Sequence, residues 1–379
     1  MKSTFPGIAR VHTMKYLIFL LLIPRLVPAQ ENPNFNVALQ LDFSSAQAMI
    51  DMCEGMANNV NRVAGQKGNA IAAATSMVLA RKQLPPAAFI HQLELLRDNF
   101  RDTDDVFGLQ ETRDHLSDIK ALLAETQRHA VDRRVLATIE QFFPSSVSVI
   151  ATIPVYFVAM GNEHAAAFVR RVRWNGASPE FVGENEGEPV VVVNLARLVE
   201  YPHDVQGQFI SLLSVLAHES FHAIFSTFQT TSTIWTQWHQ RHDPFAVLAE
   251  LVQNEGIAYY ISMQQQMNDT PPPEWYDIAA HSVVALNEAL LQLQSPDLTH
   301  AEARTLIMNA NLSGSLEKNY GATAGNLMAL EIDTKLGRPA LTESIAKGPE
   351  DFFQKYETLT QQYGDVPKIS AEVMKGFEQ

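Results

Sequence analysis

Two histidines and a glutamate lie together in one short segment of the sequence, His218-Glu219-Ser220-Phe221-His222. On an α-helix, residues four positions apart project from the same face, so His218 and His222 can bind one metal ion. Neutral imidazoles bind Zn²⁺ at about 2.0–2.1 Å. Glu219 can then reach a water molecule on the metal and accept its proton. The segment therefore predicts a zinc site for hydrolysis, with Glu219 as the general base.

The residues that flank this motif are mostly apolar. Leu, Val, Phe and Ile occupy many of the other positions between residues 211 and 225, which indicates a helix that is buried on most sides. Buried polar groups need partners, because leaving them unpaired is costly. A bound metal would supply a partner for the two histidines.

A catalytic zinc ion usually has three protein ligands and a water, and the next helix offers two candidates for the third ligand. That helix is expected to begin at Asp243-Pro244, a typical cap and first turn. Glu250 and Glu255 both lie on it, five residues apart, which is about 140° around the helix. The two carboxylates are therefore not expected to face the same metal ion.

The stretch Asn254-Glu255-Gly256-Ile257-Ala258 resembles the Asn-Glu-Gly-aromatic-Ala segment of aminopeptidase-N-like gluzincins, which are HExxH zinc metallopeptidases. The resemblance implies Zn²⁺ as cofactor and Glu255 as third ligand, with Gly256 allowing a close approach to the site. Three features depart from that family. Ile257 replaces the aromatic residue, the spacing from His222 is longer, and the element that binds a substrate's amino terminus is missing, so exopeptidase activity is not implied. The alternative ligand is Glu250, which with Asn254 is similar to the Glu-x-x-x-Asp arrangement of thermolysin-like enzymes.

A downstream tyrosine is a further candidate, because zinc peptidases often use Tyr or His to stabilise the oxyanion. Tyr320 begins a helix and is similar to the tyrosine found downstream in several gluzincins. The alternative is a core tyrosine with a satisfied hydroxyl. The wider run through Gly337, Phe352-Phe353 and Tyr356 is similar to a bacterial family of zinc-dependent peptidases known as a domain of unknown function.

Between the two helices that carry the candidate ligands lies a stretch rich in aromatic residues and histidines. It contains Trp235, Trp238, His239 and His242. We expect these residues either to line a substrate cleft or to cover the pair of helices.

The elements that must position these residues are mainly helical. Helical periodicity runs from Ser44 to about Gln127, and a further helix is expected from Val131 to Phe143. Strands are expected at Val147–Val158 and Val190–Val193, which are rich in β-branched residues. After Pro202 the pattern is helical again.

This order of elements predicts an α+β fold that is mostly α-helical. Residues 30–143 are expected to form an α-helical N-terminal region, with a polar lead-in at 30–36. Residues 144–379 are expected to form a zincin-like catalytic region, with a small sheet and the HExxH helix. In this region Val190–Val193 is a candidate edge strand that aligns an extended substrate by main-chain pairing.

The first 29 residues have the layout of a secretory signal peptide. They contain four basic residues and no acidic one, the apolar run Tyr16–Ile23, and the small-residue pattern Val27-Pro28-Ala29. The run is too short to span a bilayer, which takes about 20 residues. We therefore expect residues 1–29 to be a signal peptide and the protein to be secreted or periplasmic, with no integral membrane segment after its removal. The alternative is an apolar N-terminal helix of the folded domain.

Composition narrows the classes of partner. The chain has 28 basic and 42 acidic residues and a net charge of −14. Removing four basic residues with the signal peptide gives 24 − 42 = −18. This charge argues against nucleic acid as a partner. The single cysteine, Cys53, excludes a disulfide framework and a multi-cysteine metal site.

Together these features predict an exported zinc metallopeptidase that acts on a peptide or protein substrate. Two alternatives stay open. One is a non-catalytic metal-binding protein on a zincin fold, and the other is a zinc hydrolase of non-peptide substrates. The sequence does not predict the oligomeric state.

Overall fold

The computed structural model describes residues 32–379, except 81–83, 86, 102–103, 162–164, 184–185, 202–203, 268–270, 312–317, 365 and 379. The predicted signal peptide at 1–29 lies outside the described residues. Residues Asn32–Gln379 form one compact unit. Helices make up 65% of the structure and accompany a small five-stranded mixed sheet, which confirms the expected mostly helical α+β fold.

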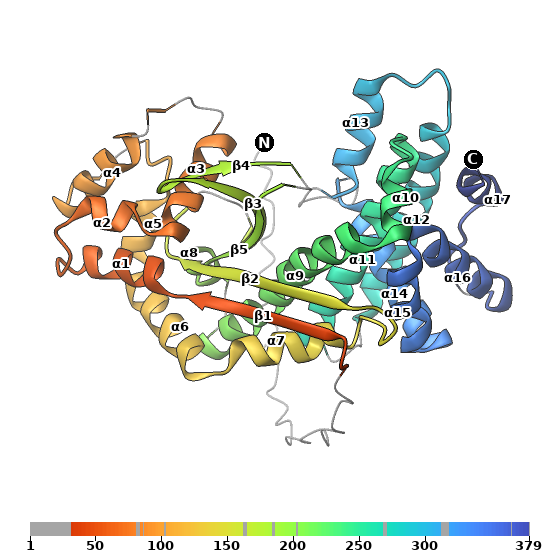
Figure 1. Ribbon diagram of the computed structural model, residues 1–379, viewed down its shortest axis with the longest axis horizontal. Coiled ribbons are helices and arrows are strands. Elements are labelled where there is room, and N and C mark those ends of the chain that lie inside the picture. The colour runs from red at the N-terminus through yellow and green to blue at the C-terminus, as the bar shows by residue number, and fades with distance from the viewer. Residues whose placement is uncertain are drawn as a thin grey trace, which may run out of the picture. The chain divides into compact units, whose positions relative to one another are not determined.

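The sheet has the strand order β1-β2-β5-β3-β4 (Figure 1). The strands β1, β2 and β5 are parallel, and β3 is antiparallel to both of its neighbours. β2 and β5 are almost entirely buried at their carboxyl-terminal ends, so the middle of the sheet lies in the core. The strand bounds are β1 Phe35–Asp42, β2 Val149–Val158, β3 Ala167–Asn175, β4 Ser178–Phe181 and β5 Glu188–Asn194.

Strand β1 is a feature that the sequence analysis did not predict, because residues 30–143 were expected to be helical behind a polar lead-in. Phe35 pairs with Val149 and Asp42 with Tyr156 in the parallel ladder with β2. The sequence Phe-Asn-Val-Ala-Leu-Gln-Leu-Asp places larger apolar residues at alternate positions, as a strand requires. The N-terminal region therefore shares the sheet with the region after residue 144.

The expectation that Val190–Val193 is an edge strand is wrong. These residues belong to β5, which lies between β2 and β3 in the interior of the sheet. The purely β-branched run reflects burial on both faces, as in the centre of a sheet. Strand β3 was missed, although Asn175-Gly176 marks its tight turn into β4 and Gly176 has the positive φ of 62° that such a turn needs.

Of the helices before β2, α1 to α5 gather at one end of the sheet, whereas α6 and α7 run below it along β1 (Figure 1). α1 and α3 pack against β2, and α7 packs against β1. Their bounds are α1 Ser44–Cys53, α2 Val60–Ala64, α3 Lys67–Leu79, α4 Ala87–Arg97, α5 Leu109–Asp114, α6 Leu116–Arg128 and α7 Val131–Glu140.

The helices after β5 build the rest of the protein around α9 and α11. α9 contacts β2, β5 and β3 on one side and α11 on another, and α11 in turn packs against α14. Their bounds are α8 Leu195–Leu198, α9 Val205–Thr231, α10 Thr233–His239, α11 Pro244–Met267, α12 Pro273–Leu293, α13 His300–Asn309, α14 Tyr320–Leu336, α15 Arg338–Lys347, α16 Pro349–Gln362 and α17 Ala371–Met374.

Among the described residues, α9 is the one helix long and apolar enough to cross a membrane. Its most apolar window is 61% buried inside the protein, and a core helix passes the same test of length and composition. The apolar character of α9 is accounted for by its contacts with the sheet and with α11.

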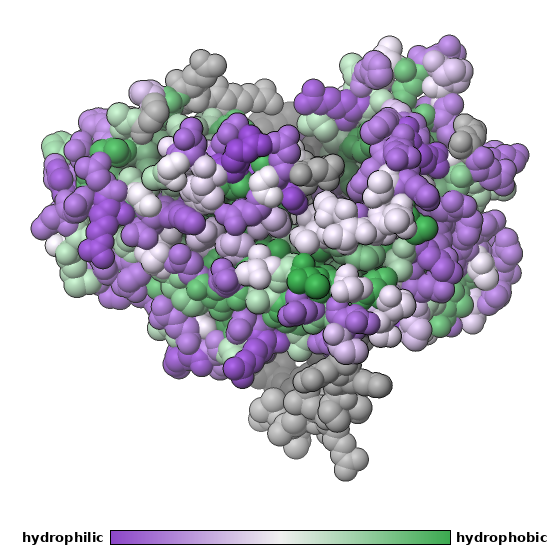
Figure 2. Space-filling model, in the orientation of Figure 1, coloured by the Kyte–Doolittle hydropathy of each residue, from purple (hydrophilic) through white to green (hydrophobic). Residues whose placement is uncertain are grey.

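Hydrophilic residues cover much of the face shown in Figure 2, and apolar ones gather along its lower middle, over β1 and β2.

A pair of glycines brings α11 and α14 into very close contact. A Cβ atom added to Gly256 of α11 would lie 2.3 Å from the carbonyl carbon of Gly325 in α14. A Cβ added to Gly325 would lie 2.0 Å from the carbonyl oxygen of Val252. The backbones can meet this closely because neither residue has a side chain. Gly256 therefore sets the distance between two helices, and it follows Glu255 directly in the chain.

Candidate metal centre

The two histidines of the HExxH segment lie on the same side of α9, one turn apart. Asp204 caps the start of the helix, and its carboxylate accepts a hydrogen bond from the backbone N–H of Gly207 at 2.8 Å. The side chains of His218 and His222 are only 12% and 15% exposed. Their rings meet edge to face with centroids 4.7 Å apart. Both imidazoles therefore point toward α11 from a rigid, mostly buried helix.

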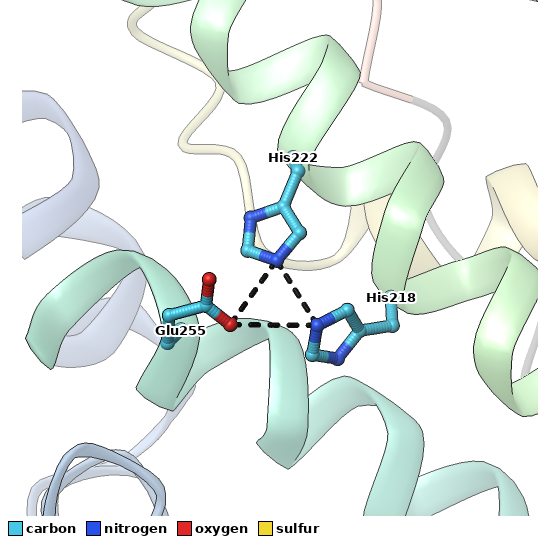
Figure 3. A group of neighbouring side chains, drawn as sticks. All are labelled: His218, His222 and Glu255. Atoms are coloured by element: carbon cyan, nitrogen blue, oxygen red, sulfur yellow. Dashed lines mark hydrogen bonds and ion pairs between the residues drawn. The ribbon is translucent and has the colours of Figure 1, made fainter. Parts of the chain in front are cut away.

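Glu255 of α11 completes a group of three ligand atoms with these imidazoles (Figure 3). The Nε2 atoms of His218 and His222 are 3.0 Å apart. The Oε2 atom of Glu255 lies 3.5 Å from the first and 3.4 Å from the second. Tetrahedral ligands at about 2.0–2.2 Å from zinc would lie about 3.3–3.6 Å from one another. The two distances to Glu255 lie in this range and the distance between the imidazole nitrogens is about 0.3 Å shorter, so the three atoms are close to the spacing that a single Zn²⁺ requires.

Asn254 orients the ring of His222. Its Oδ1 atom lies 2.9 Å from Nδ1 of His222. An amide oxygen can only accept a hydrogen bond, so Nδ1 carries the hydrogen and the lone pair of Nε2 is available to a metal. The residue next to the proposed ligand glutamate therefore holds a ligand histidine in the required tautomer.

Ser262 has the same relation to His218. Its hydroxyl donates to the carbonyl oxygen of Ser214 at 3.2 Å, so it can accept from Nδ1 of His218 at 3.4 Å. Nε2 of His218 is then also left with a free lone pair. Ser262 was not among the residues predicted for the site. Its position, seven residues and two helical turns after Glu255, is the signal that would have placed it on the same face.

The electrostatics of the three residues are strongly coupled. Burial acts to lower the pKa of His222, but the Glu255 carboxylate, together with Glu219 and the hydrogen bond to Asn254, raises that pKa to about 9. Burial acts to raise the pKa of Glu255, but His222 and His218 hold it well below its usual range. The carboxylate is therefore kept ionised, and a divalent cation would take the place of protons on the imidazoles.

Glu219 lies between the histidines in sequence and lines the cavities on both sides of the group. Burial raises its pKa, and the charges of His218 and His222 offset this only in part. A raised pKa brings a carboxylate closer to the range in which it can both accept and return a proton near neutral pH.

The rival ligand Glu250 is placed elsewhere by the structure. Its Oε1 atom accepts a hydrogen bond from Nε2 of Gln229 at 2.8 Å and lies 3.0 Å from Nε2 of His239. The group of ligand atoms found in the described part of the chain contains Glu255 and not Glu250. The 140° separation expected on the helix is the physical reason.

Tyr320 has a structural partner that the sequence could not show. Its hydroxyl donates to the carbonyl oxygen of Leu306 in α13 at 2.8 Å, and the residue is 4% exposed. This matches the alternative of a core tyrosine. A different tyrosine, Tyr259, lies beside the histidines, with its ring edge-on to that of His218 at 4.7 Å between centroids. Tyr259 follows Glu255 by one helical turn, which is a signal that the sequence did contain.

Two cavities meet at Glu219. One, which we call the charged cavity, has a volume of about 420 Å³ and includes Arg170, Arg171, His222 and Glu250 in its lining. The other, which we call the neutral cavity, has a volume of about 400 Å³ and adjoins His218 and Tyr259. The residues Ala167–Val169 of β3 run past both. The two cavities adjoin the candidate metal centre from opposite sides, and we refer to them together as the cleft.

The aromatic and histidine-rich stretch lies partly in the core and partly at a cavity. Trp235 is fully buried and donates from Nε1 to the carbonyl oxygen of Ile345 at 2.8 Å, so it packs in the core. Trp238, His239 and His242 line a third cavity of about 430 Å³ that adjoins Glu255.

Comparison with known protein families identifies a family for this chain. The sequence model of the family described as "Putative zinc dependent peptidase (DUF5700)" matches residues 54–364. The matched range contains all of α9, α11 and α14, and with them every residue of the candidate metal centre. No curated protein and no solved structure matches this chain.

Proposed function

This chain belongs to the family described as zinc-dependent peptidases, and on that premise we propose that it is a metallopeptidase with Zn²⁺ bound by His218, His222 and Glu255. The observation that carries the proposal is the triangle of ligand atoms with sides of 3.0, 3.4 and 3.5 Å. Two imidazoles and one carboxylate are a ligand set of catalytic zinc, with a fourth position left for water.

The donor set fits zinc in its chemistry as well as its spacing. Both Nε2 atoms are freed by the hydrogen bonds that Asn254 and Ser262 make to the opposite ring nitrogens. When bound, zinc would lower the pKa of a water molecule to about 7 and polarise a carbonyl group. Glu219 accepts the proton of the attacking water and passes it to the leaving amine. Asn254 and Ser262 keep the imidazoles in place throughout.

We propose Tyr259, in place of Tyr320, as the residue that donates a hydrogen bond to the developing oxyanion. Its support is its position beside His218 and at the wall of the neutral cavity.

The substrate is proposed to be a peptide that lies along β3. β4 pairs with Val172–Asn175, and within the described residues no strand pairs with the outer edge of Ala167–Val169. Alternate residues of a strand direct their N–H and C=O groups to the same edge, so this segment can pair with an extended peptide next to Glu219. β3 thus takes the role first expected of Val190–Val193. The net charge of −14 would repel nucleic acid, so we do not propose nucleic acid as the substrate.

The central test is metal analysis combined with peptide cleavage. Purified protein is expected to bind one zinc per chain and to cleave a library of proteome-derived peptides. Chelation should abolish cleavage and added zinc should restore it. Glu255→Gln should lose the metal, while Glu250→Gln should keep it. Stoichiometric zinc with no cleavage of any peptide would instead favour the non-catalytic metal-binding alternative.

Tyr259→Phe is expected to lower kcat by up to about 10²-fold with little change in KM or zinc content, because it removes one donor to the transition state. Tyr320→Phe is the matched control, since the same hydroxyl is removed from a tyrosine bonded to Leu306. Steady-state kinetics on one cleaved peptide would separate them. Equal kinetics for the two variants would rule out the role of Tyr259.

Export is proposed from the sequence of residues 1–29 alone. The mature protein, recovered from outside the cytoplasm, is expected to begin near Gln30 when its N-terminus is sequenced. An unprocessed chain starting at the first methionine or at Met14 would contradict this.

A further inference from the structure

The neutral cavity differs in chemistry from the charged cavity on the other side of Glu219. Its apolar walls include Val215, Met263 and Trp275. Apart from His218 and Glu219, which belong to the metal centre, the residues that line it are uncharged. The charged cavity instead contains two arginines of β3 together with His239 and Glu250. The charged cavity therefore suits charged or polar substrate groups, and the neutral cavity suits uncharged ones.

A buried amide faces the neutral cavity without a partner. Asn326 of α14 is 6% exposed and lines the cavity, yet its Oδ1 atom has no hydrogen-bond partner among the described residues. Buried polar groups in native proteins are nearly always hydrogen-bonded, so an exception calls for an explanation. A ligand that bonds to this amide would provide one.

Three other polar side chains that line the cavity, Ser214, Ser262 and Gln266, bond to one another across it. Nε2 of Gln266 donates to the hydroxyl of Ser214 at 2.9 Å, and the hydroxyl of Ser262 donates to the Ser214 carbonyl oxygen at 3.2 Å. Asn326 thus has a buried amide oxygen with hydrogen-bonding capacity left, in an uncharged cavity that the hydroxyl-bearing Tyr201 and Tyr259 also line.

The size of the cavity suits a large side chain. A cavity of about 150 Å³ with apolar walls already holds a benzene ring, and this one has a volume of about 400 Å³. An ammonium or carboxylate group would lose its hydration there with no opposite charge to compensate. A tyrosine side chain presents an apolar ring to such walls and a hydroxyl at its end that needs a partner.

We propose that the neutral cavity is the specificity pocket of the peptidase, and that it selects a tyrosine next to the scissile bond through a hydrogen bond to the amide of Asn326. The inference rests on the proposed peptidase function. The apolar walls contribute affinity for any large uncharged residue. Asn326 adds discrimination for the hydroxyl, because pairing that group in an apolar pocket removes an unsatisfied donor and acceptor together.

Cleavage kinetics on matched peptides test the pocket. One cleaved peptide is varied at the residue on each side of the scissile bond, with Tyr, Phe, Leu, Lys or Glu. At one of these positions Tyr is expected to exceed Phe in kcat/KM by at least about tenfold, with Lys and Glu cleaved least. Asn326→Leu, which is close in volume, should bring the ratio of Tyr to Phe near one while the Phe peptide is still cleaved. An unchanged ratio in this variant, or equal cleavage of the Lys and Tyr peptides by the unmodified enzyme, would overturn the proposal.

A binding measurement separates failure of the pocket from failure of the peptidase. N-acetyltyrosinamide and N-acetylphenylalaninamide are titrated by NMR into zinc-loaded Glu219→Gln protein, with and without Asn326→Leu. Tighter binding of the tyrosine amide, lost in the double variant, supports the pocket even if no peptide is cleaved. Equal binding of both amides contradicts the pocket even if the enzyme is active. Asn326→Ala serves as a second variant should Asn326→Leu fail to fold.

Discussion

Glu219→Gln is expected to reduce kcat for peptide hydrolysis by roughly 10²- to 10⁴-fold while the protein keeps its zinc. The amide has the size and shape of the carboxylate but cannot accept the proton of the attacking water. Glu219 is not one of the three ligand atoms, which come from His218, His222 and Glu255. The zinc content should therefore not change, and the decrease in kcat should reflect a slower chemical step.

The measurement pairs steady-state kinetics with metal analysis on the same preparation. Glu250→Gln is the matched control, because it neutralises another carboxylate of the charged cavity whose partners are Gln229 and His239. Its kcat is expected to stay within a few-fold of the unmodified enzyme. If Glu219→Gln turned over at the rate of this control, Glu219 could not be the general base, and hydrolysis would have to use another group.

The residues brought together at the candidate metal centre could be predicted from the sequence because their relation is local. His218 and His222 lie one turn apart on a helix, and Glu255 lies in a short motif on the next long helix. Helical periodicity alone orients such residues, so the faces of α9 and α11 could be inferred before their packing was known. The same rule separated Glu250 from Glu255, which the structure places in different surroundings.

The sheet and the downstream tyrosine could not be predicted in this way, because their roles depend on packing between distant segments. β5 has the composition of a strand, but whether it lies at an edge is decided by β3, which pairs with it from elsewhere in the chain. Tyr320 was correctly expected at the start of a helix. The direction of its hydroxyl is set by α13, whose Leu306 carbonyl it reaches. Local sequence thus predicts elements better than it predicts which element lies beside which.

Gly325→Ala is expected to destabilise the protein and weaken its hold on zinc. In the interior of a helix such as α14, this change alone would stabilise the fold by about 0.5–1 kcal/mol. Here the new methyl group would lie 2.0 Å from the carbonyl oxygen of Val252, far inside van der Waals contact with rigid backbone. Overpacking of this kind costs about 1–3 kcal/mol, and occasionally more, because the helices must separate. The steric cost outweighs the gain in helix propensity.

The loss of zinc follows from where the helices cross. α11 carries Glu255 next to Gly256, whose own Cβ would lie 2.3 Å from Gly325. A shift of α11 away from α14 would move the carboxylate relative to the two imidazoles of α9, and ligand positions matter at the level of tenths of an ångström. Gly325→Ala should therefore lower the free energy of unfolding of the metal-free protein and also its zinc affinity, and Gly256→Ala should do the same.

Gly364→Ala is the control for this pair, because a Cβ there would meet no atom within 4 Å. At such a site the substitution is expected to be neutral or to stabilise by up to about 1 kcal/mol. Denaturant unfolding of the metal-free proteins and competition with a zinc-binding dye would measure the two quantities separately. If Gly325→Ala unfolded at the same midpoint as Gly364→Ala and bound zinc equally well, the close crossing of α11 and α14 could not be what positions Glu255.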